Sequence, residues 1–185
     1  ADSRTIGSFM SALRSGADAV EDCPDASRAC MFSIDSCAAA CMAVSDIADS
    51  HGGVRIPTFC DTRVPGWVGP GTDAIIVSGS DSSDTRGLYD LLRSRGCRVH
   101  CIAPAGGFSG CAAAEGARFI AIPDGLDSSE TVAFSLGALC SMISLMGILD
   151  ARSELDSVLS DCSDIHVPAE IRTIACFVMI SLQLV

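Results

Sequence analysis

The segment from Ser78 to Thr85, with the sequence SGSDSSDT, carries five hydroxyl side chains within eight residues. It follows an apolar run typical of a buried strand and precedes a helical pattern. Hydroxyls next to the free N–H groups of a helix start can bind an anion such as phosphate without any lysine. One serine can also simply cap the helix while Asp84, in its first turn, complements the helix dipole. The segment therefore predicts either an anion site or a capped, solvated helix start.

Two further residues are candidates for acid–base catalysis. Glu130 lies at the start of a helical pattern, where it could act as a base or only interact with the helix dipole. His51 lies in a polar turn, from which it could reach a neighbouring subunit's site or remain solvated. We expect His100, which alternates with apolar strand residues, in the core and His166 in a loop.

The elements that would position these residues alternate between apolar runs and helical patterns. Strands are expected at residues 29–34, 73–77, 98–103 and 118–122, and helices at about 3–21, 36–49, 84–94, 128–149 and 152–159. A short alanine-rich helix is expected between the last two strands. Strands that alternate with helices predict an α/β fold, a three-layer α/β/α sandwich with a central parallel sheet. We expect one domain over residues 1–185, with helical segments from about 152 to 185.

Composition excludes several classes of function. The net charge of −11, with no lysine and scattered arginines, argues against a nucleic-acid partner, because phosphate backbones need a basic surface. The apolar run at residues 174–185 is too short to span a bilayer, so we expect no membrane anchor. We expect this run to form a buried helix or strand, or to be covered by a second subunit.

The eleven cysteines indicate buried thiols in a reducing cytoplasm. Most have apolar neighbours, and the N-terminal residues lack the pattern of a signal peptide. The closest pairs, Cys37 with Cys41 and Cys97 with Cys101, are more widely spaced than the C-x-x-C of a zinc site. We therefore expect neither a metal nor a cofactor.

Residues 55–85 resemble the bifunctional phosphoglucose/phosphomannose isomerases of the sugar isomerase (SIS) superfamily. That family has a P-x-x-x-R-D-Y-x-L-P segment before a strand ending in S-Y-S-G-N-T-E-E-T, and this chain has IPTFCDTRVPGWV before VSGSDSSDTRG. The family's G-G-S loop would fall on residues 34–36. Its later G-G and P-x-G-x-x-P-R elements resemble AGG at 105–107 and PDGLDSS at 123–129. The resemblance spans residues 31–149 in the correct order.

The resemblance implies a SIS, flavodoxin-like fold and a sugar-phosphate ligand interconverted between aldose and ketose forms. The predicted phosphate- and sugar-binding residues are Ser36, Ser78, Ser80, Ser83 and Thr85. The resemblance places the first four on the family's phosphate contacts, while Thr85 belongs to the same hydroxyl-rich loop.

The chain departs from the family pattern at several positions. Asp35 and Asp81 replace glycines, and a carboxylate there would repel phosphate unless it points away. The family's proline–arginine pair falls on Ser128 and Ser129, which removes an expected cation. The catalytic glutamate and histidine proposed for the family lie beyond the region of resemblance.

Three functions remain open from the sequence. The chain is a sugar-phosphate isomerase whose site a partner subunit completes, a SIS domain that binds its ligand without turnover, or a structural or interaction domain that has lost the site. The 6-phospho-3-hexuloisomerases, single SIS domains acting as oligomers, are a further alternative that lacks the proline-containing lead-in. In each case we expect a homodimer.

Overall fold

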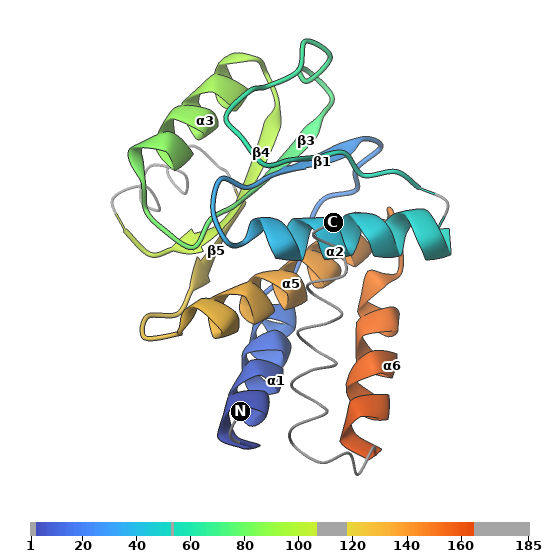
Figure 1. Ribbon diagram of the computed structural model, residues 1–185. Helices are drawn as coiled ribbons and strands as arrows, with labels where there is room; N and C mark the ends of the chain where they lie inside the picture. Colours follow the sequence, from blue (N-terminus) through green and yellow to red (C-terminus); the bar gives the residue numbers. More distant parts are fainter. Residues whose placement is uncertain (1–2, 53, 107–117, 165–185) are drawn as a thin grey trace.

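The computed structural model describes residues 3–52, 54–106 and 118–164 (Figure 1). Its centre is a sheet of five strands in the order β2-β1-β3-β4-β5, and every neighbouring pair is parallel. The strands are β1 (Ala29–Phe32), β2 (Thr58–Phe59), β3 (Asp73–Val77), β4 (Arg98–Pro104) and β5 (Arg118–Ile122). The predicted α/β fold with a central parallel sheet is confirmed.

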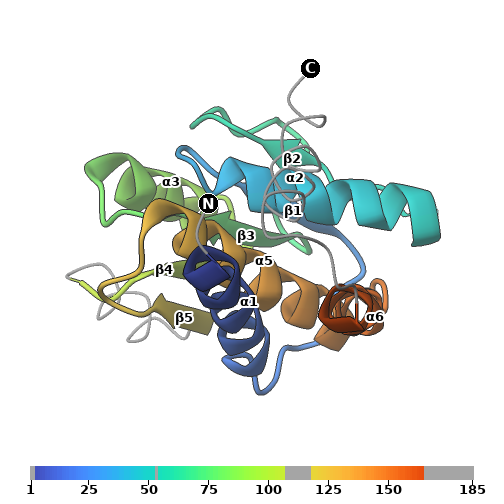
Figure 2. The ribbon, with the colours of Figure 1, turned by 60° about the horizontal axis from the view of Figure 1, so that its bottom comes forward.

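Helices cover both faces of this sheet (Figure 2). The helices are α1 (Ser3–Asp18), α2 (Ala38–Ile47), α3 (Ser83–Ser94), α5 (Ser128–Leu145) and α6 (Ala151–Asp164). A π-helical turn, Ala48–Gly52, follows α2. Helix α3 packs on one face, and the other four helices lie on the opposite face, so the molecule has three layers.

The strand side chains alternate between two hydrophobic cores, as the period of two in a β-strand requires. In β3, Ile75 and Val77 belong to the larger core with α1, α2, α5 and α6, whereas Ala74 and Ile76 belong to the smaller core with α3. All five residues of β3 are buried. This burial on both faces explains why the strand reads as a continuous apolar run.

Helices α1 and α5 pack closely through two glycines. A Cβ atom at Gly137 would overlap the Leu13 carbonyl oxygen and lie 2.8 Å from the Ala17 nitrogen. A Cβ at Gly16 would overlap the carbonyl oxygen of Phe134 and lie 2.7 Å from its carbonyl carbon. Glycine at these positions therefore lets the two helix backbones touch directly.

Polar contacts hold the end of α1 against α5 and α6. The Ser141 hydroxyl and the Arg152 guanidinium both donate to the Ala17 carbonyl, at 2.7 and 2.8 Å. Arg152 also forms an ion pair with Asp18 at 2.8 Å. These bonds satisfy a carbonyl that the helix end leaves without an intrahelical partner.

Helix α5 is the core helix of the larger layer. Among the described residues it is the one helix whose length and apolar composition would suit a membrane span, but buried core helices share those properties. Most of its side chains are buried against α1, α2 and the sheet. The helix is largely apolar because most of its side chains lie in the core.

Several boundaries differ from the predictions. The predicted helix at 128–149 ends at Leu145, and Gly147 then adopts a positive φ of 70° that helical residues do not have. The first helix ends at Asp18 and α3 begins one residue early, at Ser83. The two-residue strand β2 was not predicted. The expected alanine-rich helix and the segment 165–185 lie outside the described residues.

Candidate functional site

The loops after β1 and β3 leave the sheet in opposite directions. The chain passes from β1 through α2 to the edge strand β2, whereas it passes from β3 through α3 to β4 on the other side. In an open parallel sheet, such a switch point at the carboxyl ends of the strands is the usual ligand site. The two loops that the sequence selected, near Asp35 and from Ser78 onwards, meet here.

The carboxylate of Asp35 lies among the hydrogen-bond donors of this switch point. Its Oδ2 accepts the backbone N–H of Gly79 at 2.7 Å and lies 2.8 Å from the Ser78 hydroxyl. Its Oδ1 accepts the N–H of Cys37 at 2.9 Å, which closes a turn at the start of α2. The sequence predicted that a carboxylate here would repel an anion unless it points away. It points into the loop, because β1 and β3 are adjacent and the donors of one loop face the other.

A chain of hydroxyls continues from Asp35 to the start of α3. Ser78 Oγ accepts a hydrogen bond from Thr85 Oγ1 at 3.1 Å, and Thr85 Oγ1 lies 2.9 Å from Ser82 Oγ. Ser82 is the N-cap of α3 and accepts the N–H of Thr85 at 3.2 Å. The expected serine cap is therefore present, and it is provided by Ser82.

The start of α5 and the β4 loop complete the surroundings of the switch point. A Cβ added at Gly79 would lie 3.3 Å from the Thr131 methyl group and 3.4 Å from the Cys37 sulfur. A Cβ at Gly106 would overlap the carboxylate of Asp81. Side chains from the β1 loop, the β3 loop and α5 thus close around Gly79, which has room for no side chain without a shift of its neighbours.

The predicted binding residues divide into two groups at this edge. Ser78 and Thr85 are fully buried, with hydroxyls that hydrogen-bond within the network above. Ser36, Ser80 and Ser83 are exposed around it. The structure brings these loops together, and it adds two groups that the sequence did not identify as part of the site: the Asp35 carboxylate as an acceptor and the Gly79 N–H as a donor.

Glu130 lies at the same edge, in a capping box. The Asp127 side chain accepts the N–H groups of Ser129 and Glu130 at 2.8 and 2.9 Å, and Glu130 Oε2 accepts the N–H of Asp127 at 3.0 Å. This reciprocal pair of hydrogen bonds satisfies backbone N–H groups that a helix start leaves without intrahelical partners. These hydrogen bonds lower the pKa of Asp127, first through the Glu130 N–H and then through Ser129.

His51 lies at the other end of the molecule from the serine loop. Helix α2 begins just after the β1 loop and runs back across the sheet, so the turn that contains His51 follows its far end. The chain then enters β2 past Val54 and Ile56, which line a hollow together with Ser27 and Arg28 from before β1. Within one chain, His51 is therefore placed at the amino edge of the sheet.

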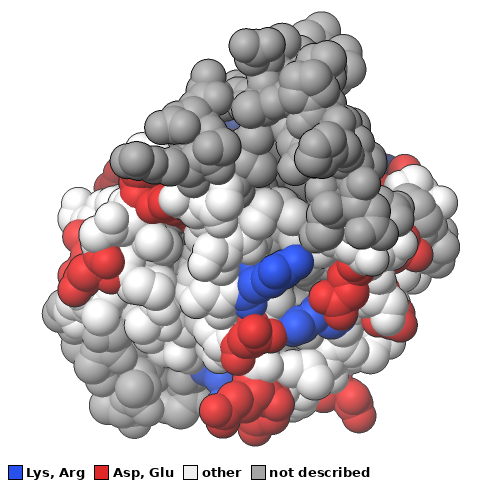
Figure 3. Space-filling view, turned by 90° about the horizontal axis from the view of Figure 1, so that it is seen from below, with Lys and Arg blue, Asp and Glu red and all other residues white. Residues whose placement is uncertain are grey.

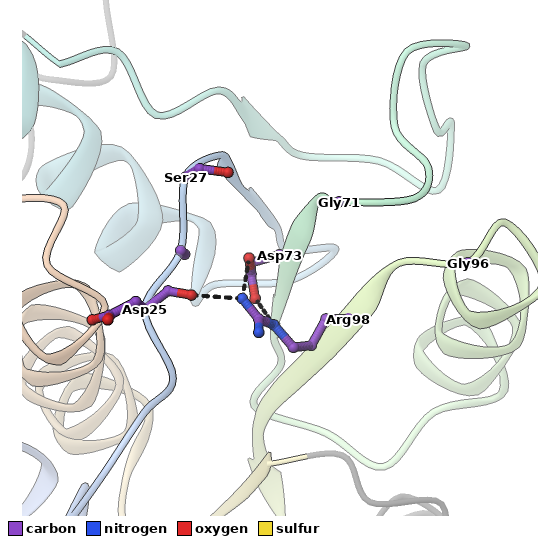
Figure 4. Close-up of a pocket in the computed structure, with 7 residues that line it drawn as sticks. Asp25, Ser27, Gly71, Asp73, Gly96 and Arg98 are labelled. Atoms are coloured by element: carbon purple, nitrogen blue, oxygen red, sulfur yellow. Dashed lines mark hydrogen bonds and ion pairs between the residues drawn. The ribbon is translucent and has the colours of Figure 1, made fainter.

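The amino edge also carries an ion pair between the buried Asp73 and the exposed Arg98 (Figure 4). Asp73 is buried at the start of β3 and accepts hydrogen bonds from Arg98 and, at 3.0 Å, from His100 Nε2. Burial lowers the pKa of His100, and the hydrogen bond to Asp73 offsets this in part. Asp73 and Arg98 line a hollow with Asp25, Ser27 and Gly71. As predicted, His100 lies in the core.

Charges at the carboxyl edge are unfavourable for an anion from solution. Asp81 and Asp84 are exposed there, and the guanidinium of Arg63, near the end of β2, pairs with Asp61 at 2.7 Å. On the face seen from below, the arginine side chains border aspartates and glutamates (Figure 3). In that view, the described residues form no basic patch.

The thiol beside the site is protonated at neutral pH. Burial raises the pKa of Cys37 to about 12, although its hydrogen-bonding contact with Ser135 at 3.6 Å lowers it in part. A thiol in that state is a poor nucleophile. Within residues 3–52, 54–106 and 118–164, no group of three or more His, Cys, Asp or Glu side chains is arranged to hold a metal ion.

Several solved structures have a fold similar to that of this chain. A crystal structure from Salmonella typhimurium LT2, of a protein assigned to the phosphosugar isomerases, matches 85% of this chain with a TM-score of 0.51 and 14% identity. A similarly assigned structure from Silicibacter pomeroyi DSS-3 matches 83% with a TM-score of 0.52 and 14% identity. The chain has the fold of the phosphosugar isomerase structures. It spans about half the length of each, 50% and 48%.

At this low identity the likeness extends to the fold alone. No protein-family model matches the sequence, and the curated proteins include no significant match. The structural neighbours agree with the fold expected from the motifs, whereas the SIS family and the specific resemblance to phosphoglucose/phosphomannose isomerases rest on the sequence alone. The chemistry of the site therefore has to be argued from its own residues.

Proposed function

We propose that this chain is a SIS-type domain that binds a sugar phosphate at the β1 and β3 loops and does not isomerise it unaided. The observation that supports this proposal is the position of the Asp35 carboxylate, which receives the Gly79 N–H and lies within hydrogen-bonding distance of the Ser78 hydroxyl. The loop thus already binds an oxyanion, one that belongs to the chain itself.

A phosphate group needs the same donors as a carboxylate. Backbone N–H groups and hydroxyls at a helix start are a common phosphate-binding arrangement. The exposed hydroxyls of Ser80 and Ser83 stand on the same loop and could reach the outer phosphate oxygens. The sugar would then extend toward the start of α5, where Thr131 approaches Gly79.

Isomerisation requires more than this binding site. Moving a proton between adjacent carbons needs a carboxylate base beside the sugar and a group that assists ring opening. Glu130 Oε2 accepts the Asp127 N–H at 3.0 Å, and His51 of the same chain lies at the opposite edge of the sheet. Turnover would therefore need a group from a partner subunit, such as the partner's His51 in the homodimer that we expect.

A thermal-shift titration tests the binding proposal. Glucose 6-phosphate, fructose 6-phosphate, mannose 6-phosphate and inorganic phosphate are each added to the purified chain. A ligand at 100 times its Kd stabilises the folded state by about 2.7 kcal/mol. For a domain of this size that corresponds to a rise in Tm of roughly 5–10 °C. We expect such a rise with at least one sugar phosphate, at a lower concentration than inorganic phosphate requires.

Two matched serine variants locate the site. Ser80→Ala removes an exposed hydroxyl from the loop and should weaken the shift. Ser94→Ala removes one at the far end of α3, where its hydroxyl donates to the Leu91 carbonyl at 2.7 Å, and should leave the shift unchanged. A coupled assay should detect no interconversion of glucose and fructose 6-phosphates. The absence of any sugar-phosphate shift would contradict the proposal, and turnover would favour the isomerase.

A further inference from the structure

Asp35 uses both carboxylate oxygens at the switch point. Oδ1 closes the turn to Cys37, and Oδ2 lies at 2.7 and 2.8 Å from the Gly79 nitrogen and the Ser78 hydroxyl. The second pair of contacts joins loops 43 and 44 residues apart in sequence, so it is a tertiary interaction and not part of the local turn. A hydrogen bond to an ionised group is stronger than one between neutral groups.

The same two donors are those that a bound phosphate would use. The Ser78 hydroxyl has one proton and lies 2.9 Å from the Ser80 carbonyl as well as 2.8 Å from Asp35, so it donates to one of these at a time. The Gly79 N–H has Asp35 as its acceptor. A phosphate oxygen can reach these donors only when the Asp35 side chain has left them.

We infer that Asp35 is a tethered competitor for the anion site and sets the affinity and selectivity of the chain for phosphorylated ligands. This inference takes its ligand, a phosphorylated compound, from the proposed function. The competition by Asp35 itself is argued from the hydrogen bonds to Gly79 and Ser78. While Asp35 accepts hydrogen bonds from Gly79 and Ser78, these donors are not available to an anion. The carboxylate also repels the anion by its negative charge. Only ligands whose other contacts offset the release of Asp35 bind well, so free inorganic phosphate is selected against.

The expected effect follows from the fraction of molecules in which Asp35 is released. The apparent Kd of a ligand is its intrinsic Kd divided by the fraction of competent molecules. Taken at the net strength of ordinary intramolecular hydrogen bonds, the two bonds favour the closed arrangement by a factor of roughly 10 to 100. Removing the competitor should tighten phosphate binding by roughly the same factor.

Asp35→Ser is the variant of choice. A serine oxygen can still accept the Cys37 N–H in an equivalent turn, but its side chain is too short to reach Gly79 as well. The matched control is Asp81→Ser, which removes one negative charge from the same edge. Asp81 lies against Gly106 and forms none of the hydrogen bonds to the Gly79 or Ser78 donors described above.

Inorganic phosphate and the three sugar phosphates are titrated by calorimetry into the wild-type chain and both variants. We expect roughly tenfold or greater tightening for inorganic phosphate in Asp35→Ser and about threefold or less in Asp81→Ser. Equal tightening in both variants would assign the effect to net charge and overturn the inference. No tightening in a folded Asp35→Ser would overturn it as well.

The amide signal of Gly79 provides a test that needs no ligand and no serine variant. In the wild-type chain, the N–H of Gly79 should resonate downfield, as expected for a hydrogen bond to a carboxylate, and it should move upfield in the isosteric Asp35→Asn. A Gly79 signal that is the same in both proteins would refute the tethered contact. If Asp35→Ser binds inorganic phosphate more tightly than the wild-type chain does, but no sugar phosphate binds better than inorganic phosphate, the inference stands and the proposed function fails.

Discussion

Replacing Gly137 by alanine should destabilise the chain through the contact between α1 and α5. The added Cβ would overlap the Leu13 carbonyl oxygen and lie 2.8 Å from the Ala17 nitrogen, both of them backbone atoms that cannot rotate away. Because non-bonded contacts are optimal near 3.5–4.0 Å, the helices must separate by about 0.7 Å or more. Overpacking of this kind costs about 3 kcal/mol, and the better helix propensity of alanine returns about 1 kcal/mol.

The net loss of about 2 kcal/mol in the free energy of unfolding corresponds to a fall in Tm of roughly 4–8 °C for a domain of this size. Calorimetry or circular dichroism would measure it. Gly87→Ala is the matched control, because Gly87 also lies within a helix but a Cβ there meets nothing within 4 Å. That control should gain about 0.5–1 kcal/mol. If Gly137→Ala were as stable as Gly87→Ala, the close packing of the two helices would be refuted.

Two further predictions concern buried groups. Because burial lowers the pKa of His100 below its ordinary 6.5, the unfolded chain binds the proton more readily, and the folding stability that neutral His100 supports should fall as the pH drops below about 6.5. Urea unfolding at pH 7.5 and 5.5 should show a smaller loss of stability in His100→Gln than in the wild-type chain, and an equal loss would refute the assignment of this pH dependence to the imidazole. Cys60, the exposed thiol among the described cysteines, should react quickly with a thiol reagent, whereas burial raises the pKa of Cys101 to about 12 and makes it slow. Cys60→Ser should remove one fast-reacting equivalent, and an unchanged fast phase would contradict this assignment.

The main strands of the sheet could be predicted because each is a continuous apolar run with a clear end. Strands β3 and β5 have the predicted bounds, since each run ends at a serine or a proline that leaves the sheet. Strand β2 could not be predicted. It has two residues, Thr58 and Phe59, directly after Pro57, and that length shows no alternation of polar and apolar side chains.

The loops that form the candidate site could be identified from the sequence, but the contact between them could not. The serines and the helix start identify the β3 loop, because these are local signals. The approach of Asp35 to Gly79 depends on two loops brought together by the pairing of β1 and β3, which no local pattern encodes. For the same reason, no local pattern shows that Gly16 and Gly137 are positions where the backbones of α1 and α5 come too close for a side chain.

The pairing of α1 with α5 also bears on how the chain folds as it leaves the ribosome. Ser141 donates to the Ala17 carbonyl across 124 residues. At typical synthesis rates of 5–20 residues per second, α1 waits roughly 6–25 s before its partner emerges. During that time α5 is not yet present to pack against the apolar face of α1 and the first strands. A chaperone that binds these exposed apolar surfaces would be needed most in that interval, and a slowly translated stretch before α5 would prolong it.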